Sequence, residues 1–297
     1  MELWVAFTLL AAAAQTLRFA LQKALGGGAL SPGGATFARF LYAAPLAALS
    51  AALALAVTGT ALPPISPRFL AFVLAGGLAQ IVATELTVRL FGLRSFASGI
   101  AFTKTETIQI ALVSTLVLGD PVSAVGFLAI AIGFAGVIGL SRVKAPGAGG
   151  AIRPIVYGLL AGGLFAIASL AYRGATLALE PAPFLVRALV ALAAATAWQT
   201  LAMVIWLSIR EPGEIRRVLG GWRRTAPVGI LGLLGSLGWF AAFALQNAAY
   251  VRGLGQIEVV FTFLASTLYF REKLGPREIV AILLITLSVL LLVLEFG

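Results

Sequence analysis

The chain has 297 residues, of which 61% are hydrophobic and only 11% charged, whereas soluble domains carry about 25% charged residues. A soluble protein of this length cannot hide so much apolar surface from water, so we expect an integral membrane protein. The net charge is +10, and there is no cysteine and no histidine. Their absence excludes disulfides, thiolate or imidazole catalysis and the common zinc and haem sites, so we expect no cofactor and no metal.

Apolar stretches of the length that a bilayer crossing requires follow one another along the whole chain. In the first half they lie at about residues 3–24, 36–57, 69–92, 97–118 and 121–141. In the second half they lie at about 154–178, 184–208, 226–248, 255–270 and 276–296. A linker-like stretch, VKAPGAGG at 143–150, separates the halves. We therefore predict an all-α integral membrane protein with ten transmembrane helices in two domains, residues 1–145 and 151–297.

The fourth and ninth spans repeat each other. A shift of 152 residues aligns Lys104 and Glu106 with Gln256 and Glu258, and it aligns the tripeptide STL at 114–116 with STL at 266–268. Because each half has an odd number of spans, the second half enters the membrane from the side opposite the first. The sequence thus predicts two inverted five-helix repeats around a central cavity.

The orientation follows from the basic residues. The loops after odd-numbered spans hold thirteen Lys and Arg residues, while the opposite loops hold three, Arg68, Arg173 and Arg252. The positive-inside rule then places the odd loops in the cytoplasm and both termini in the periplasm, for a multi-pass protein of the cell inner membrane. Basic residues placed in this way indicate topology signals rather than nucleic-acid binding.

Glycines recur along one flank of the eighth span, at Gly229, Gly232, Gly235 and Gly238. Small residues at this spacing let two helices approach closely, so we predict tight backbone packing there.

Polar and ionisable side chains inside the spans are few, and each charged one costs on the order of 2.5–3.5 kcal/mol at the bilayer centre. We expect them to face the interior, a partner or water and to converge on one cavity. The exceptions lie near span ends and are interpreted as anchors: Arg89, Arg39 and Arg187. The candidate substrate-binding residues comprise polar groups and an aromatic wall: Gln15, Arg18, Gln80, Glu85, Lys104, Glu106, Gln109, Gln246, Asn247 and Glu258, with Phe19, Phe102, Trp239 and Phe240.

The two repeated acids have two interpretations, and both stay open. Glu106 and Glu258 either line a substrate path, where they accept an ammonium group or carry a coupling proton, or each closes a buried ion pair that fixes packing. On a regular helix Lys104 points about 200° away from Glu106. Lys104 is therefore expected either to pair with a neighbouring helix or to face a different wall of the cavity.

The turns after the fourth and ninth spans read LGDP at 118–121 and FREKL at 270–274. Two five-helix halves, each with an acidic turn after the fourth helix, resemble the drug/metabolite transporter superfamily with paired EamA-type domains. The family usually has Gly-Glu at this turn, where this chain has Gly-Asp and Arg-Glu. The resemblance implies transport of metabolites, often amino acids outward, through a central cavity without ATP. The overall pattern is similar to the bacterial aromatic amino acid exporters of the YddG type.

We therefore expect a non-enzymatic secondary transporter that exports small metabolites, amino acids and aromatic ones among them, by alternating access. Neither a GxSxG nucleophile elbow nor a GxxxxGK[ST] phosphate loop is present, so the sequence indicates neither a hydrolase nor an ATP-driven pump. The alternatives are a passive channel or facilitator, and an exporter of other metabolites or cationic drugs. The expected partners are a small-molecule substrate and the lipid bilayer, with proton coupling left open, and the protein is expected to be a monomer or weak dimer.

Overall fold

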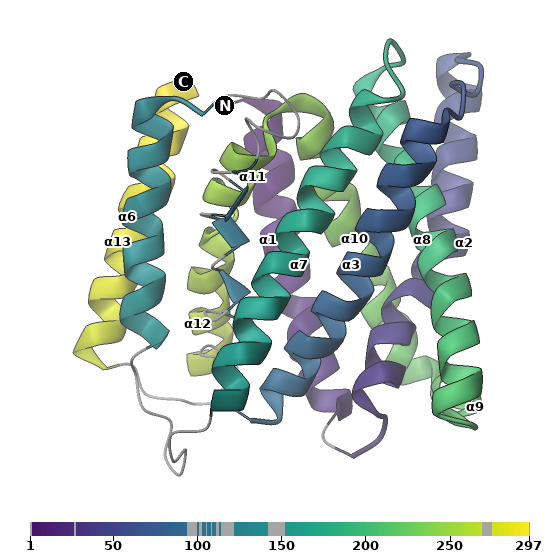
Figure 1. The fold of residues 1–297 in the computed structure, drawn as a ribbon, viewed down its shortest axis with the longest axis horizontal. Coiled ribbons are helices and arrows are strands. Elements are labelled where there is room, and N and C mark those ends of the chain that lie inside the picture. The colour runs from purple at the N-terminus through teal and green to yellow at the C-terminus, as the bar shows by residue number, and fades with distance from the viewer. Residues whose placement is uncertain are drawn as a thin grey trace.

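The computed structural model describes residues 2–26, 28–93, 100, 103–104, 106–107, 109–110, 113, 122–141, 152–268 and 275–296. These residues form helices and connecting turns, with no strand among them. The helices are α1 (Leu3–Gly26), α2 (Pro32–Thr58), α3 (Pro67–Phe91), α6 (Ala124–Ser141), α7 (Ile152–Leu177), α8 (Phe184–Arg210), α9 (Glu214–Gly220), α10 (Trp222–Leu245), α11 (Ala248–Leu254), α12 (Ile257–Leu268) and α13 (Pro276–Phe296). Figure 1 shows them side by side in one bundle, with both chain ends at the same end and α9 at the opposite end.

Six of the described helices are long and apolar enough to cross a bilayer, namely α1, α2, α3, α7, α8 and α10. Shorter apolar segments, Ala124–Gly136 in α6 and Ile279–Leu292 in α13, coincide with the fifth and tenth predicted spans. The ninth span is predicted from residue 255, but its helix, α12, begins at Ile257. The preceding helix, α11, ends at Leu254, and a turn separates the two. Most of the fourth predicted span lies outside the described residues. The protein is a multi-pass membrane protein, and the total of ten spans stays a prediction.

The ends of the long helices follow from local sequence. Ser31 and Ser66 cap α2 and α3, because their hydroxyls accept hydrogen bonds from the amides of Gly34 at 2.9 Å and Phe69 at 3.1 Å. A proline follows each cap at the start of the helix, where no amide hydrogen is needed. The α2 helix ends before Gly59, whose φ of 62° lies in the left-handed region that suits glycine. Short polar turns therefore separate long apolar helices.

Helices of the first half pack along helices of the second: α1 along α10, α2 along α8, α3 along α7 and α6 along α13. Two glycines of α10 allow its close contacts with α1 and α2. A Cβ built on Gly238 would lie 2.6 Å from the carbonyl oxygen of Phe7 in α1, and one built on Gly229 would lie 2.4 Å from Cβ of Tyr42 in α2. The predicted close packing along this flank is confirmed.

The bundle turns apolar side chains outward and polar ones inward. Leu53, Leu78 and Ile205 on α2, α3 and α8 are more than half exposed, whereas Gln22 and Glu258 are fully buried. An apolar exterior without a compensating polar face suits a solvent of lipid chains rather than water. The interior is thus the place where the polar candidates can meet.

Candidate functional site

A buried ion-pair network joins the two repeated acids. The ammonium Nζ of Lys104 lies 2.5 Å from Oε2 of Glu258 and 3.7 Å from Oε1 of Glu106. Nη2 of Arg252, on α11, lies 3.7 Å from the other Glu106 oxygen, Oε2. All four side chains are at most 5% exposed. Two cations and two carboxylates therefore balance one another inside the bundle.

Lys104 pairs with a neighbouring helix, as predicted, because Glu258 belongs to α12. The prediction that it points away from Glu106 is wrong. Lys104 lies in a turn, and the amide of Thr107 donates to the carbonyl oxygen of Lys104 at 3.2 Å. This i to i+3 hydrogen bond is tighter than that of a regular α-helix, so the angle between side chains departs from the regular value.

The two carboxylates are held differently. Oε2 of Glu258 accepts hydrogen bonds from Lys104 at 2.5 Å and from Nε2 of Gln15, in α1, at 2.8 Å. Oε2 of Glu106 has no hydrogen-bond partner within the described part of the chain, and its cationic neighbours stand at 3.7 Å. Oε1 of Glu258 is likewise buried without a hydrogen-bond partner among the described residues. Glu258 is therefore fixed through one oxygen by two direct hydrogen bonds, whereas no such short bond is seen at Oε2 of Glu106, and each carboxylate keeps an oxygen that can accept a further donor.

Trp239 of α10 connects the network to two more helices. Its Nε1 donates to Oε1 of Gln15 at 3.0 Å, so Gln15 bridges the indole and Glu258. The guanidinium of Arg252 lies 4.3 Å from the Trp239 ring centroid, within the range of a cation–π contact. Nε of Arg252 also donates to Oγ of Ser169 in α7 at 2.8 Å. The site thus draws on α1, α7, α10, α11 and α12, besides the residues around Lys104.

An interruption of the helix between α10 and α11 brings Arg252 inward. Gln246 is extended and ends α10, and the Asn247 side chain accepts a hydrogen bond from the Ala249 amide at 2.7 Å to begin α11. The predicted placement of Gln246 and Asn247 inside the eighth span is therefore wrong, because they separate two helices. The placement of Arg252 in an outward loop is also wrong, since Arg252 is buried on α11.

Two other polar candidates have different partners. Oε1 of Gln80, in α3, accepts hydrogen bonds from the Tyr172 hydroxyl at 2.9 Å and from Nε2 of Gln199 at 2.7 Å, which ties α3 to α7 and α8. Glu85 pairs with Arg89 one turn further along α3, at 2.5 Å. No contact with the ion-pair network is recorded for either residue in the described part of the chain.

Of the predicted aromatic wall, Trp239 contacts the network. Phe240 packs against Tyr172 with ring centroids 4.4 Å apart, and Phe19 meets Phe91 edge to face at 5.6 Å. Phe102 lies outside the described residues. The aromatic candidates are thus divided between the network and the core.

Two further arginines are buried in the bundle, on α1 and α2. Arg18, a predicted site residue, and Arg39 are 1% and 2% exposed. The interpretation of Arg39 as an anchor at a span end is wrong, since its guanidinium donates to the hydroxyls of Thr84 in α3 and Ser236 in α10. Sequence reasoning also missed Ser169; a lone serine in an apolar helix gives no signal that distinguishes it from its neighbours.

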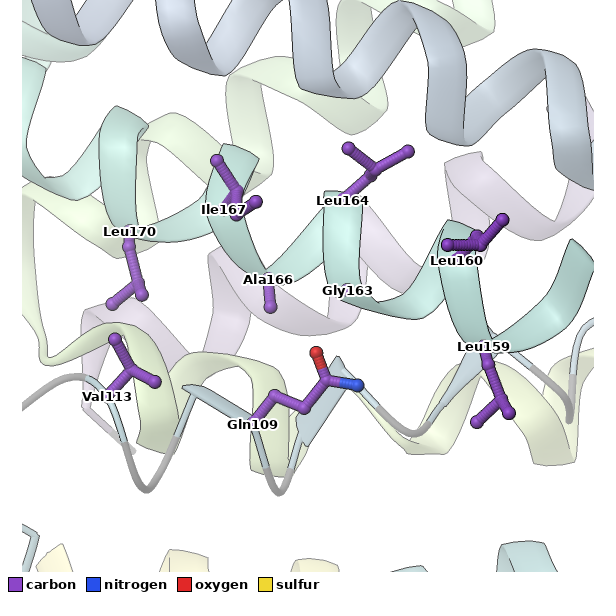
Figure 2. Close-up of a pocket in the computed structure, with 9 residues that line it drawn as sticks. All are labelled: Gln109, Val113, Leu159, Leu160, Gly163, Leu164, Ala166, Ile167 and Leu170. Atoms are coloured by element: carbon purple, nitrogen blue, oxygen red, sulfur yellow. The ribbon is translucent and has the colours of Figure 1, made fainter. Parts of the chain in front are cut away.

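A cavity of about 320 Å³ lies between α7 and the described residues Gln109 and Val113. Figure 2 shows a lining that is apolar apart from the Gln109 amide, which points toward Gly163. Gln109 follows Glu106 by three residues, and Ala166 in the lining precedes Ser169 by three, so the cavity borders helix faces that carry network residues. An apolar cavity with one polar group suits a small organic ligand.

The described residues contain no group of three or more acidic side chains that could hold a metal ion. The site instead offers paired charges, amide groups and an indole beside apolar space. This arrangement suits recognition of a small charged molecule.

Part of this chain is similar in sequence to a known transporter family. Residues 152–294 match the EamA-like transporter family. This EamA-like domain runs from α7 into α13, and it supplies Trp239, Arg252 and Glu258 to the network. The match supports a membrane transporter of small molecules.

The fold has a counterpart that extends beyond the EamA-like domain. A solved structure described as "Crystal structure of protein" superposes with a TM-score of 0.69 and 15% identity, over 98% of this chain and 97% of that chain. At this identity the likeness shows the fold alone, across both halves. No curated protein matches the chain.

Proposed function

We propose that this protein is a secondary transporter that exports a small metabolite, with amino acids as the first candidates, across the cell inner membrane without ATP. The observation that carries the proposal is the position of Lys104 between Glu258 at 2.5 Å and Glu106 at 3.7 Å, inside a bundle of apolar helices. A packing role needs one closed pair. Here a second carboxylate is buried, and each of the two has an oxygen without a hydrogen-bond partner among the described residues, which suits a ligand.

In this proposal the halves 1–145 and 151–297 are inverted repeats that rock against each other around the network. Two features support the arrangement. First, α1 and α7 begin at opposite ends of the bundle (Figure 1). Second, the packing is reciprocal: the first helix of each half lies along the third helix of the other, as α1 with α10 and α7 with α3. A twofold relation between the halves requires such reciprocity.

The network also suggests how an amino acid would bind. Its ammonium group would take the free acceptor of Glu106, in competition with Lys104 and Arg252, and its carboxylate would take a nearby cation. Its side chain would enter the apolar cavity beside Gln109. Exchange of partners at Glu106 would couple binding to movement of the two halves, because a substrate can stabilise one arrangement of the network over another.

A counterflow screen in proteoliposomes tests the function. Vesicles preloaded with an unlabelled amino acid, nucleoside or cationic drug are diluted into medium with the labelled compound, and transient uptake is followed. A carrier gives saturable counterflow for at least one class. Continuous conductance without saturation would instead indicate the alternative function, a passive channel.

A further inference from the structure

The described interior holds more positive than negative charge. The charges of the network around Lys104 balance one another. The buried Glu214, at the start of α9, is paired with Arg217 at 2.8 Å. Two more cations, Arg18 in α1 and Arg39 in α2, are also buried. Neither forms an ion pair with a carboxylate of the described residues. Arg18 and Arg39 are thus two buried cations without a paired carboxylate among the described residues.

Among the described residues, the hydrogen-bond partners of these two guanidinium groups are neutral. Nη1 of Arg18 donates to Oε1 of Gln22 at 2.5 Å, and Nη2 of Arg18 has no hydrogen-bond partner among the described residues. Arg39 donates to the hydroxyls of Thr84 at 3.0 Å and Ser236 at 3.2 Å. Amide and hydroxyl oxygens solvate a cation in part, but they do not neutralise it.

The two arginines are neighbours and adjoin the network. A Cβ built on Gly232, in α10, would lie 2.9 Å from Cγ of Arg39 and 3.5 Å from Cδ of Arg18. Arg18 follows Gln15 by three residues, so the two lie on the same face of α1 about one turn apart. Gln15 in turn binds Glu258. The arginines therefore adjoin the ion-pair network through Gln15.

Buried cations without a counter-charge are costly, and a bound anion would remove that cost. We propose that Arg18 and Arg39 form an anion subsite and that the transported metabolite carries a net negative charge, with a carboxylate held by the guanidinium groups. This inference rests on the proposed transport function and narrows its substrate class. A zwitterion adds no net charge and a cation adds to the excess, whereas an acidic amino acid or a dicarboxylate offsets it.

Four labelled probes test the inference in chloride-free proteoliposomes: glutamate, succinate, phenylalanine and lysine. We expect saturable counterflow for glutamate or succinate, and none for lysine. Counterflow of phenylalanine or lysine without either anion overturns the anion inference and leaves the proposed transport function standing. No counterflow for any of the four overturns the anion inference, and the proposed transport function then depends on the nucleosides and cationic drugs of the wider screen.

Substitution of Arg18 separates binding from packing. Arg18→Gln removes the charge but keeps donors near Gln22, so anion counterflow should fall by roughly tenfold or more. The melting temperature without substrate should equal or exceed that of the wild type, and glutamate or succinate should no longer raise it. Arg187→Gln is the matched control, because Arg187 pairs at 2.6 Å with the exposed Glu180, and its counterflow should be unchanged. A lowered melting temperature with unchanged counterflow per folded molecule overturns the anion subsite.

Discussion

Glu106 and Glu258 have the same chemistry but different surroundings, and this difference separates function from packing at the residue scale. Glu258 accepts two short hydrogen bonds, from Lys104 and Gln15, so it stabilises the arrangement of α1 and α12. Glu106 has two cations at 3.7 Å, and its Oε2 has no donor in the described part of the chain. We interpret Glu258 as the fixed partner of the network and Glu106 as the exchangeable one.

Paired substitutions test this assignment. Glu106→Gln should leave the free energy of unfolding within about 1 kcal/mol of wild type, because few direct bonds are lost, and it should abolish counterflow. Glu258→Gln should cost about 3 kcal/mol, because it leaves Lys104 without its direct counter-charge. Unfolding is followed by tryptophan fluorescence in detergent, and counterflow is normalised to folded protein.

Glu180→Gln serves as the control for these substitutions, since the Glu180 side chain is 56% exposed and pairs with Arg187 at the surface. Both stability and counterflow should be unchanged. If Glu106→Gln lowers stability as much as Glu258→Gln and transports at the wild-type rate, Glu106 is a packing residue and the binding site lies elsewhere.

At the scale of elements, α10 is the helix that contacts the site and both neighbouring helices of the first half. Its glycines bring it against α1 and α2, and its Trp239 reaches Gln15 across the same contact. The hydrogen bond from Trp239 to Gln15 at 3.0 Å depends on how closely the α1 and α10 backbones approach. Packing along the glycine flank therefore positions the site.

Two alanine substitutions one turn apart test this packing. In Gly238→Ala the new methyl group would lie 2.6 Å from the Phe7 carbonyl oxygen, so the helices must separate, at a cost of about 1–3 kcal/mol. In Gly235→Ala the nearest atom is 3.5 Å away, which is ordinary contact, and the better helix propensity of alanine should add up to about 1 kcal/mol of stability. Melting temperatures of the two variants should move in opposite directions. Equal effects would show that the α1–α10 contact does not depend on Gly238.

At the scale of the whole molecule, the two ends of the bundle differ in charge. The exposed basic residues of the α9 region, among them Arg216 and Arg217, lie at one end, and the turn between α2 and α3 lies at the other (Figure 1). The positive-inside rule places the α9 end in the cytoplasm. Burial of Arg252 strengthens this assignment, because it removes a basic residue from the opposite end.

Single cysteines test the orientation, on a chain that has none of its own. Arg216→Cys and Pro64→Cys are suitable because both positions are exposed; Gly213 is avoided, since its φ of 91° would strain any side chain. A membrane-impermeant maleimide should label position 64 in intact cells and position 216 only after permeabilisation. Labelling of position 216 from outside would reverse the orientation and with it the direction of export.

Sequence periodicity and spacing were sufficient to predict several features of this protein. Apolar runs predict the long helices, because burial of backbone hydrogen bonds in lipid leaves few other conformations. The internal repeat singles out Glu106 and Glu258, because a charge in an apolar span is costly enough to be rare. The glycine flank of α10 predicts its close contacts for a similar reason, since small residues rarely recur at that spacing without a neighbouring helix.

The tertiary structure alone decided which of these charges meet. A helical pattern orients a side chain relative to its own axis, but the helix that faces it comes from a distant part of the chain: Lys104 and Glu258 are 154 residues apart. The break at Gln246 and Asn247 turns Arg252 inward, and local sequence does not reveal that direction. Packing likewise buried Arg18 and Arg39 without a carboxylate among the described residues, because their neighbours on α3 and α10 present hydroxyl groups or glycine there.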